Sequence, residues 1–194
     1  ILRTYFYGLN VAKAPLNNPL VRQALAYAID RKELVQILAG GQIPIQGWLP
    51  PGVLGYEADR GLSFSPQKAR ELLLKAGFSD LANFPKLTLG FNTNEDNQRI
   101  GENIQAQLKK NLGISIELKN EEWKVFLNSL KTDAPHIFRS GWQADFPDPD
   151  NFMNLMTSFS ENNRTKWKNK KFDDLVKQGS AETSVEKRIK IYSE

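Results

Sequence analysis

The residue types best suited to bind another molecule lie together in the stretch RSGWQADFPDPD, from Arg139 to Asp150. It follows a short apolar run at 137–138, which predicts a strand. Gly141 permits close approach of another molecule, and Pro147 and Pro149 restrict the backbone on either side of Asp148. The stretch therefore predicts a stiff loop that leaves a strand and fixes an indole and several carboxylates near its start.

Trp142 and Asp145 define the chemistry that this loop could perform. An aromatic wall beside a carboxylate suits a ligand that is cationic at one end and apolar at the other. The alternative is a surface turn with solvated carboxylates and a core tryptophan, and composition leaves both interpretations open. Asp148 and Asp150 precede an apolar helix pattern that begins at Phe152, so we expect them to cap a helix rather than contact a ligand.

Composition excludes several classes of site. The chain has 194 residues, of which 40% are hydrophobic and 25% charged, as in a globular domain. It has no cysteine and a single histidine, His136, which we expect to be structural. We therefore predict no metal site and no cofactor. An enzyme with Asp145 and Asp148 as acid and base is an alternative, but the chain lacks a nucleophile elbow and a phosphate loop.

The net charge of +4 would permit binding to nucleic acid or to an anionic surface. The positive residues are scattered, apart from a run between Arg164 and Lys171. Nucleic-acid binding normally shows a basic stripe or a recognition motif, and neither is present. We expect the run to be a solvated loop and predict no nucleic-acid partner. No apolar run reaches membrane-spanning length.

Apolar periodicity and capping residues predict the elements that position the Arg139–Asp150 stretch. Asn18 and Pro19 open one helix, Asp30 and Glu33 have capping-box spacing for a second, and Ser65 caps a third. Strands are predicted at 4–10, 86–91, 114–119 and 136–140. Further helices carry apolar residues at 100–112, at 123–130, after 152, at 172–176 and at 185–192.

A long connection at 42–63 interrupts this pattern. Its central part, Pro44 to Tyr56, is rich in proline and glycine. A loop of this length inside a compact domain is often functional. We predict that it is ordered, packed by Trp48 and Leu49.

The alternation of strands and helices predicts an α/β domain with a mainly parallel sheet flanked by helices. Ligands of such sheets bind at the carboxyl ends of the strands. The predicted loop leaves such an end, which favours a binding role for Trp142 and Asp145.

Several short motifs, taken in order, resemble one protein family. They are YFYGLN at 5–10 before VRQALAYAIDR at 21–31, LPPG at 49–52, SPQKARELL at 65–73 with AGF at 76–78, LGI at 112–114, EW at 122–123, and GWQAD at 141–145 with DP at 148–149. Each motif alone is weak, but together they span nearly the whole chain. In this order they resemble the large C-terminal lobe of peptide-binding proteins of ABC importers, solute-binding protein family 5.

The resemblance implies that residues 1–194 form a single α/β lobe of a two-lobed periplasmic-binding-protein-like fold (type II, cluster C). The other lobe would come from sequence outside this chain. The implied function is to bind short peptides between the lobes and deliver them to ABC permease subunits, as a periplasmic or extracytoplasmic monomer that is not an enzyme. The same fold also takes up nickel complexes, haem, antibiotics and sugars, so a non-peptide ligand is the alternative.

The resemblance also implies roles for individual residues. Asp145 would pair with the peptide's α-ammonium, Trp142 would line the cleft, and the backbone beside it, including Gln143, would pair with the peptide main chain. Trp123 would line a side-chain pocket, and Arg139 would receive the peptide carboxylate.

The residues themselves leave alternatives open for two of these positions. Trp123 is also a candidate helix core residue, and Arg139 a candidate for a structural ion pair. The chain departs from the family pattern at Gly8, where some members have an acidic residue, and at Leu130, where some have an arginine; Lys131 could substitute for the latter.

Overall fold

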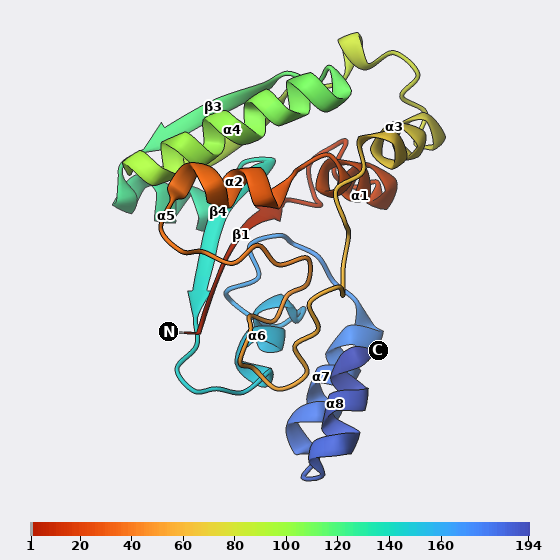
Figure 1. The fold of residues 1–194 in the computed structure, drawn as a ribbon, viewed down its shortest axis with the longest axis vertical. Helices are drawn as coiled ribbons and strands as arrows, with labels where there is room; N and C mark the ends of the chain where they lie inside the picture. Colours follow the sequence, from red (N-terminus) through yellow and green to blue (C-terminus); the bar gives the residue numbers. More distant parts are fainter. Residues whose placement is uncertain (1) are drawn as a thin grey trace.

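The computed structural model describes residues 2–194, so Ile1 of the predicted lobe lies outside the described residues. Its centre is a four-stranded sheet in the order β1-β4-β2-β3. The strands are β1 (Arg3–Leu9), β2 (Leu87–Asn92), β3 (Ile116–Glu121) and β4 (Ile137–Gln143). Helices flank the sheet, and a second group of helices and loops lies below it in the view of Figure 1.

The sheet is mainly parallel, as predicted. Strand β2 pairs in parallel with β3 and with β4, whereas β1 pairs antiparallel with β4. One boundary differs from the prediction, because β4 continues through Gly141 and Trp142 to Gln143. Pairing with Thr4 and Tyr5 of β1 extends the strand across the glycine that we interpreted as the start of a loop.

The main hydrophobic core lies between one face of the sheet and four helices: α1 (Pro19–Tyr27), α2 (Arg31–Leu38), α3 (Pro66–Lys75) and α4 (Glu95–Leu112). Alternate residues of β2, namely Leu87, Leu89 and Phe91, point into it and are fully or almost fully buried. They meet Ile100 and Ile104 of α4 in the same cluster. The 3-10 helix η1 (Leu81–Asn83) precedes β2.

Helix α5 (Trp123–Thr132) covers the other face of the sheet. Its side chains Phe126 and Leu130 pack with Phe138 of β4 in a smaller cluster. Neighbouring residues of β4 therefore face opposite cores, since Ile137 belongs to the main core and Phe138 to that of α5. This alternation fixes the register of β4 and hence the direction of its later side chains.

The predicted caps are largely confirmed. Asn18 and Ser65 accept backbone N–H groups at the starts of α1 and α3. Gly113 ends α4 with a φ of 76°, a conformation that glycine adopts without strain. Asp30 caps α2 as well, by accepting the Lys32 N–H at 2.9 Å. The reciprocal bond of a capping box is not formed, because the Asp30 N–H donates to Gln107 Oε1 and Glu33 accepts from Asn103.

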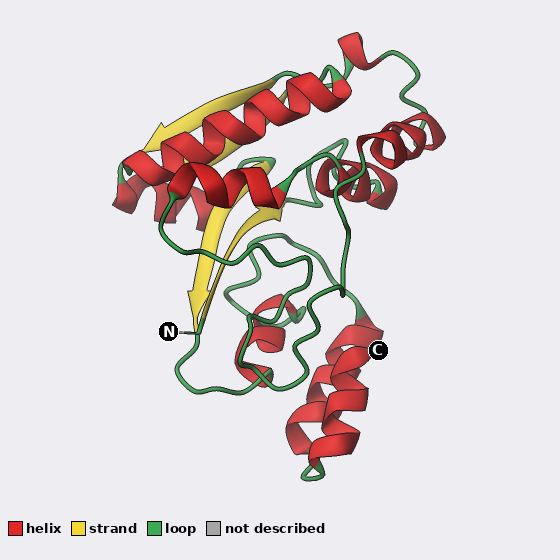
Figure 2. Ribbon diagram, in the orientation of Figure 1, coloured by secondary structure: helices red, strands yellow, loops and turns green. Residues whose placement is uncertain are grey.

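Below the sheet, the long loop between α2 and α3 packs on the C-terminal elements (Figure 2). These are α6 (Asp150–Met153), η2 (Asn154–Met156), α7 (Lys170–Ala181) and α8 (Val185–Ser193). Leu49, Val53 and Phe152 form a buried cluster, and Trp48 Nε1 donates to the Phe152 carbonyl at 2.8 Å. The predicted packing of the Pro44–Tyr56 loop by Trp48 and Leu49 is confirmed, and its order stays a prediction.

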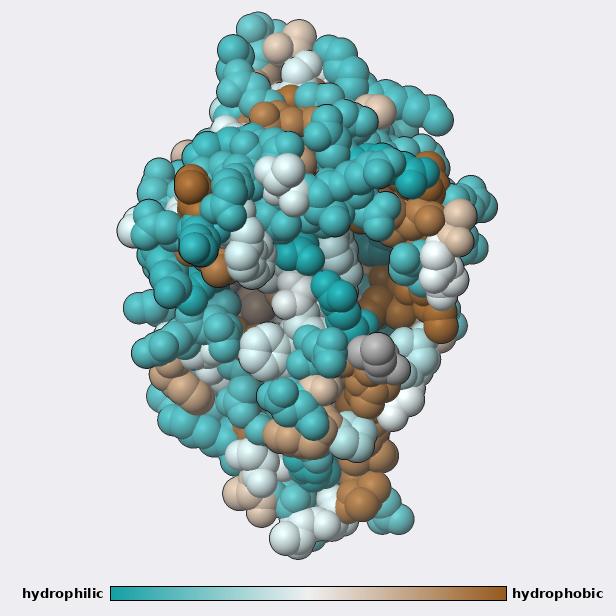
Figure 3. Space-filling view, turned by 90° about the vertical axis from the view of Figure 1, so that its left-hand side faces the viewer, coloured by the Kyte–Doolittle hydropathy of each residue, from teal (hydrophilic) through white to brown (hydrophobic). Residues whose placement is uncertain are grey.

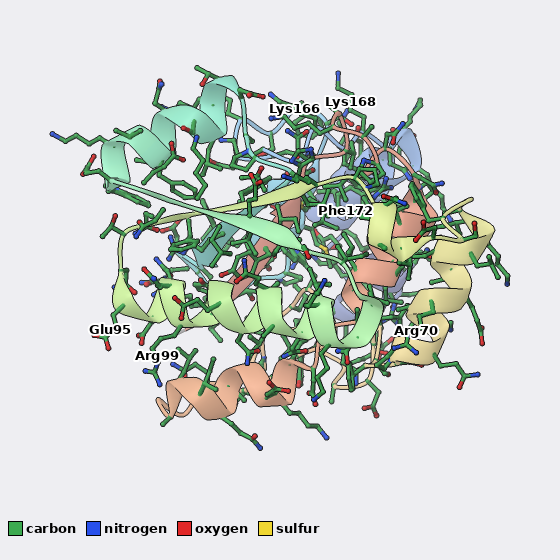
Figure 4. The ribbon with its side chains drawn as sticks, turned by 90° about the horizontal axis from the view of Figure 1, so that it is seen from above. Arg70, Glu95, Arg99, Lys166, Lys168 and Phe172 are labelled. Atoms are coloured by element: carbon green, nitrogen blue, oxygen red, sulfur yellow. The ribbon has the colours of Figure 1, made fainter. Side chains whose placement is uncertain are left out.

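The basic run from Arg164 to Lys171 is exposed over most of its length, as predicted, and continues into α7. Figure 4 shows Lys166 and Lys168 at the edge of the molecule, beyond Phe172. Lys170 pairs with Asp174 and Lys171 with Glu194. In residues 2–194, none of the helices combines the length and the apolar character needed to cross a membrane.

Candidate functional site

One edge of β4 is open beyond its first two residues. The strand pairs with β1 along its whole length, from Ile137 to Gln143. Its pairing with β2 on the other side covers only Ile137 and Phe138. Along that second edge, Arg139–Gln143 has no strand partner among the described residues, and its side chains are partly or fully exposed. Backbone groups on this edge can pair with an added extended chain.

Trp142 lies in β4 rather than in a loop, opposite Thr4 of β1. Its indole Nε1 donates to Asn151 Oδ1 at 2.6 Å, and its ring packs partly against the cluster of Leu49, Val53 and Phe152. The hydrogen bond and the packing fix the orientation of the indole while leaving the residue half-buried. Trp142 is therefore neither a fully buried core residue nor a mobile surface residue.

Asp145 follows the end of β4 by two residues and is exposed, as is Gln143. Its carboxylate takes part in no hydrogen bond or salt bridge within residues 2–194. The preceding residue is tethered, because the Ala144 N–H donates to the Leu2 carbonyl at 2.9 Å. The structure thus presents an unpaired carboxylate directly beyond the open edge of β4. Figure 3 views the molecule from the side of the N-terminus and shows a mainly hydrophilic face with hydrophobic residues gathered along one edge.

Arg139 occupies the start of the open edge and sits in a polar cluster. Its guanidinium donates to Asn92 Oδ1 at 3.2 Å and lies over the Tyr5 ring, 5.2 Å from the centroid. Its Nε is buried without a hydrogen-bond partner. None of the salt bridges among the described residues involves Arg139. The ion-pair interpretation of Arg139 is therefore wrong, and the guanidinium keeps donors available for an anion.

Sequence reasoning missed the residues around Arg139. The Tyr5 hydroxyl donates to Asn97 Oδ1 at 3.0 Å and lies 3.3 Å from the Tyr7 hydroxyl. Burial raises the pKa of both tyrosines, so both hydroxyls stay neutral donors. The sequence did contain a signal for this cluster. Tyr5 and Tyr7 alternate along β1, and Asn92 ends β2, at the carboxyl ends of the parallel strands.

A groove of about 1420 Å³ runs between β1, α1, α2, the long loop and the C-terminal helices. Of the five predicted site residues, only Arg139 lines it. Trp142, Gln143 and Asp145 lie further along β4 and outside that lining. The site on β4 is thus an open surface that shares only Arg139 with the lining of the groove.

Trp123 stands apart from the other predicted residues. It begins α5 directly after β3, the edge strand, and β2 separates β3 from β4. It is 47% exposed, and its ring lies 6.4 Å from that of Phe126. The interpretation of Trp123 as a core residue is therefore wrong.

His136 is structural, as predicted. Its Nδ1 accepts the Thr88 N–H at 3.3 Å, and its carbonyl accepts the Asn10 N–H at 2.9 Å. Burial, followed by the charge of Lys13, lowers its pKa. The imidazole therefore remains a neutral acceptor that links β4 to β2.

Asp148 caps the start of α6, as predicted, because its Oδ1 accepts the Asp150 N–H at 2.8 Å, whereas Asp150 is the first residue of the helix and makes no such bond. Asp148 also receives two bonds from Arg188 of α8, at 2.6 and 2.7 Å. Asp150 Oδ1 accepts from the Tyr192 hydroxyl at 3.1 Å. The sequence signal that we missed is a charged residue, Arg188, in the apolar stripe of Val185, Ile189 and Tyr192.

Comparisons with known proteins identify the family and the fold of this chain. The model of the bacterial extracellular solute-binding proteins, family 5 (middle region), matches residues 1–164. The chain belongs to this family. It is 35% identical over 200 residues to the oligopeptide-binding protein OppA of Bacillus subtilis, covering 98% of this chain and 37% of that protein.

Solved structures of the family superpose closely on this chain. An oligopeptide-binding protein (OppAIV) of Borrelia burgdorferi gives a TM-score of 0.91 at 37% identity, covering 100% of this chain and 39% of the other. OppA of Haemophilus influenzae, in complex with the peptide RPPGFSPFR, gives 0.91 at 30% identity, covering 99% and 39%. The chain therefore spans well under half the length of the family members that it matches.

The two departures from the family pattern have structural causes. A Cβ placed on Gly8 would lie 2.2 Å from the Phe138 ring, so an acidic side chain there requires Phe138 to move. Leu130 is 7% exposed and belongs to the core under α5, whereas Lys131 is exposed. In this chain, Gly8 contacts the Phe138 ring and Leu130 belongs to the same apolar cluster as Phe138.

Proposed function

We propose that this chain is the peptide-binding lobe of an extracytoplasmic solute-binding component of an ABC importer. The intact protein binds short peptides between this lobe and a second one and delivers them to permease subunits in the membrane. It acts as a monomer and has no catalytic role. The observation that carries the proposal is the open edge of β4 from Arg139 to Gln143, with the unpaired Asp145 carboxylate beyond one end and, at the other, the Arg139 guanidinium, whose buried Nε has no hydrogen-bond partner among the described residues.

Main-chain pairing suits a receptor for many peptides, because it ignores side-chain identity. An extended peptide along β4 places its backbone groups against those of Trp142 and Gln143. The fixed indole of Trp142 forms an apolar wall beside that path. Trp123, exposed on α5, forms the wall of a side-chain pocket.

The two ends of the peptide are recognised by charge. Asp145 accepts from the ammonium, which has three donors and no acceptor. Arg139, which lies over the Tyr5 ring, receives the carboxylate. These charge pairs strengthen when lobe closure removes water from the cleft.

The test is the affinity of the intact receptor for free and N-acetylated peptides, measured by isothermal titration calorimetry. Asp145→Asn keeps the shape of the side chain and removes its charge. Truncating one partner of a buried charge pair costs roughly 2–5 kcal/mol, or about thirty-fold to a few thousand-fold in affinity. We expect the variant to lose affinity for a free peptide by that factor.

An N-acetylated peptide provides the control, because it has no ammonium. It should bind the unmodified receptor weakly and lose little more with Asp145→Asn. If Asp145→Asn binds free peptide within about two-fold of the unmodified receptor, Asp145 does not bind the ammonium and is a solvated turn residue.

A further inference from the structure

The position of Asp145 depends on the short loop that carries it. Its own carboxylate has no hydrogen bond or salt bridge within residues 2–194, so no side-chain contact holds it in place. The loop is tied at its start by the Ala144 N–H, which donates to the Leu2 carbonyl. Its other end is Asp148, between Pro147 and Pro149, whose rings restrict the intervening backbone.

Asp148 forms a bidentate salt bridge with Arg188, which lies forty residues further along the chain. Arg188 Nη1 donates to Oδ2 at 2.6 Å and Nη2 to Oδ1 at 2.7 Å. The two side chains are only 17% and 26% exposed. Oδ1 also accepts the Asp150 N–H, so the carboxylate is fixed both to α8 and to its own loop. Hydrogen bonding to Arg188 holds the pKa of Asp148 below its usual value.

Arg188 is itself fixed in orientation. Its Nε donates to the Gly179 carbonyl at 2.8 Å, and its guanidinium lies over the Tyr192 ring. The Tyr192 hydroxyl donates to Asp150, which gives the loop a second attachment to α8. A Cβ on Gly179 would lie 2.6 Å from the Tyr192 ring, so the glycine allows α7 and α8 to approach closely.

We propose that Arg188 is a positioning residue for the ligand's ammonium: by fixing Asp148 it holds the 144–149 loop so that the Asp145 carboxylate faces the cleft. This inference rests on the proposed role of Asp145. A binding group that is already held in its bound position loses less entropy when the ligand arrives. Arg188 touches no ligand itself and acts only through Asp148.

The test compares intact receptors that carry Arg188→Ala, Arg188→Lys or no change. The probes are trialanine, tetra-alanine and penta-alanine, each free and N-acetylated, in isothermal titration calorimetry. We expect Arg188→Ala to weaken binding of the free peptides about tenfold, as supporting residues near a site typically do. Binding of the acetylated peptides should change by less than about two-fold. Arg188→Lys keeps the positive charge but loses the guanidinium that makes two hydrogen bonds to Asp148. Its affinity for free peptides should therefore lie between those of the unmodified receptor and Arg188→Ala.

Lys187→Ala is the matched control, because it removes an exposed positive charge from the same helix and should leave both affinities unchanged. The double variant Arg188→Ala with Asp145→Asn should bind free peptide no more weakly than Asp145→Asn alone. Both substitutions remove the same interaction, that of Asp145 with the ammonium, so their effects should not add.

Two results overturn the proposal in distinguishable ways. Equal losses for free and acetylated peptides would mean that Arg188 only supports the fold of the lobe. An unmodified receptor that binds free and acetylated peptides equally well would instead remove the proposed role of Asp145, and the role of Arg188 with it.

Discussion

Among single residues, Asp148 gives the clearest dependence on pH. Arg188 lowers its pKa in the folded protein, so its contribution to stability is full above the ordinary value near 4 and is lost as the pH falls through the lowered value. Asp148→Asn should cost about 2 kcal/mol of unfolding free energy at neutral pH, because the paired carboxylate is replaced by a neutral amide. Urea unfolding at a series of pH values measures the free energy of unfolding of the unmodified protein and of the variant.

Unfolding measured at acidic pH distinguishes loss of the Asp148–Arg188 pair from a general loss of stability. The difference between the unmodified protein and the variant should shrink steadily as the pH falls below about 4. A constant difference across that range would show that the charge of Asp148 does not stabilise the docking of α8.

At the scale of elements, the loop from Pro44 to Tyr56 depends on α6 for its order. Phe152 is fully buried between Leu49 and Val53, and its carbonyl accepts the Trp48 indole N–H. Phe152→Ala should cost about 3–5 kcal/mol through the cavity it leaves. It should also speed amide exchange at Leu49 and Val53, while Leu89 of β2 stays protected.

Phe159→Ala is the matched control for Phe152→Ala, because it removes the same side chain from an exposed position. Phe159 is 58% exposed, and its one aromatic contact is with the Lys177 ammonium. Its removal should cost no more than about 1 kcal/mol. A loop whose amides exchange at the rate of an unfolded chain in the unmodified protein would contradict the packing described here.

Local signals in the sequence predicted most elements correctly, because they act over a few residues. Asn18 and Ser65 cap their helices, and Gly113 ends α4. The end of β4 was predicted wrongly, because pairing of Gly141 and Trp142 with β1 depends on residues far away in the sequence. A glycine such as Gly141, a few residues before prolines, indicates a turn only when no neighbouring strand extends the pairing.

The same limit applies to the candidate site. Asp145 and Trp142 could be placed near a strand end from local pattern, and Arg139 could be assigned to the same strand. Arg188 could not be linked to Asp148, because no local pattern predicts a contact across forty residues. The partners of Arg139 were likewise hidden, since Tyr5 comes from β1 and Asn92 from β2.

For the whole molecule, the proposed function makes the candidate site on this chain one wall of a binding cleft. The open edge of β4, the Asp145 carboxylate and the Arg139 guanidinium all lie on this chain, which spans 37% of the length of Bacillus subtilis OppA. Water reaches an open edge freely, so charge pairs made there are weak. In the proposed function, tight binding requires a second wall that excludes water from the same contacts.

Residues 1–194 alone should therefore fold but bind peptide poorly. The main core between the sheet and α1, α3 and α4 is formed entirely within this chain, which supports independent folding. Losing the contacts of the opposite wall should cost roughly 3 kcal/mol or more, which is at least about a hundred-fold in affinity. Calorimetric titration of the isolated lobe and the intact receptor with the same peptide gives the ratio, and a cooperative thermal transition checks that the lobe is folded. Equal affinities would place the whole binding site on this lobe, and the open edge of β4 would then bind peptide without any closing wall.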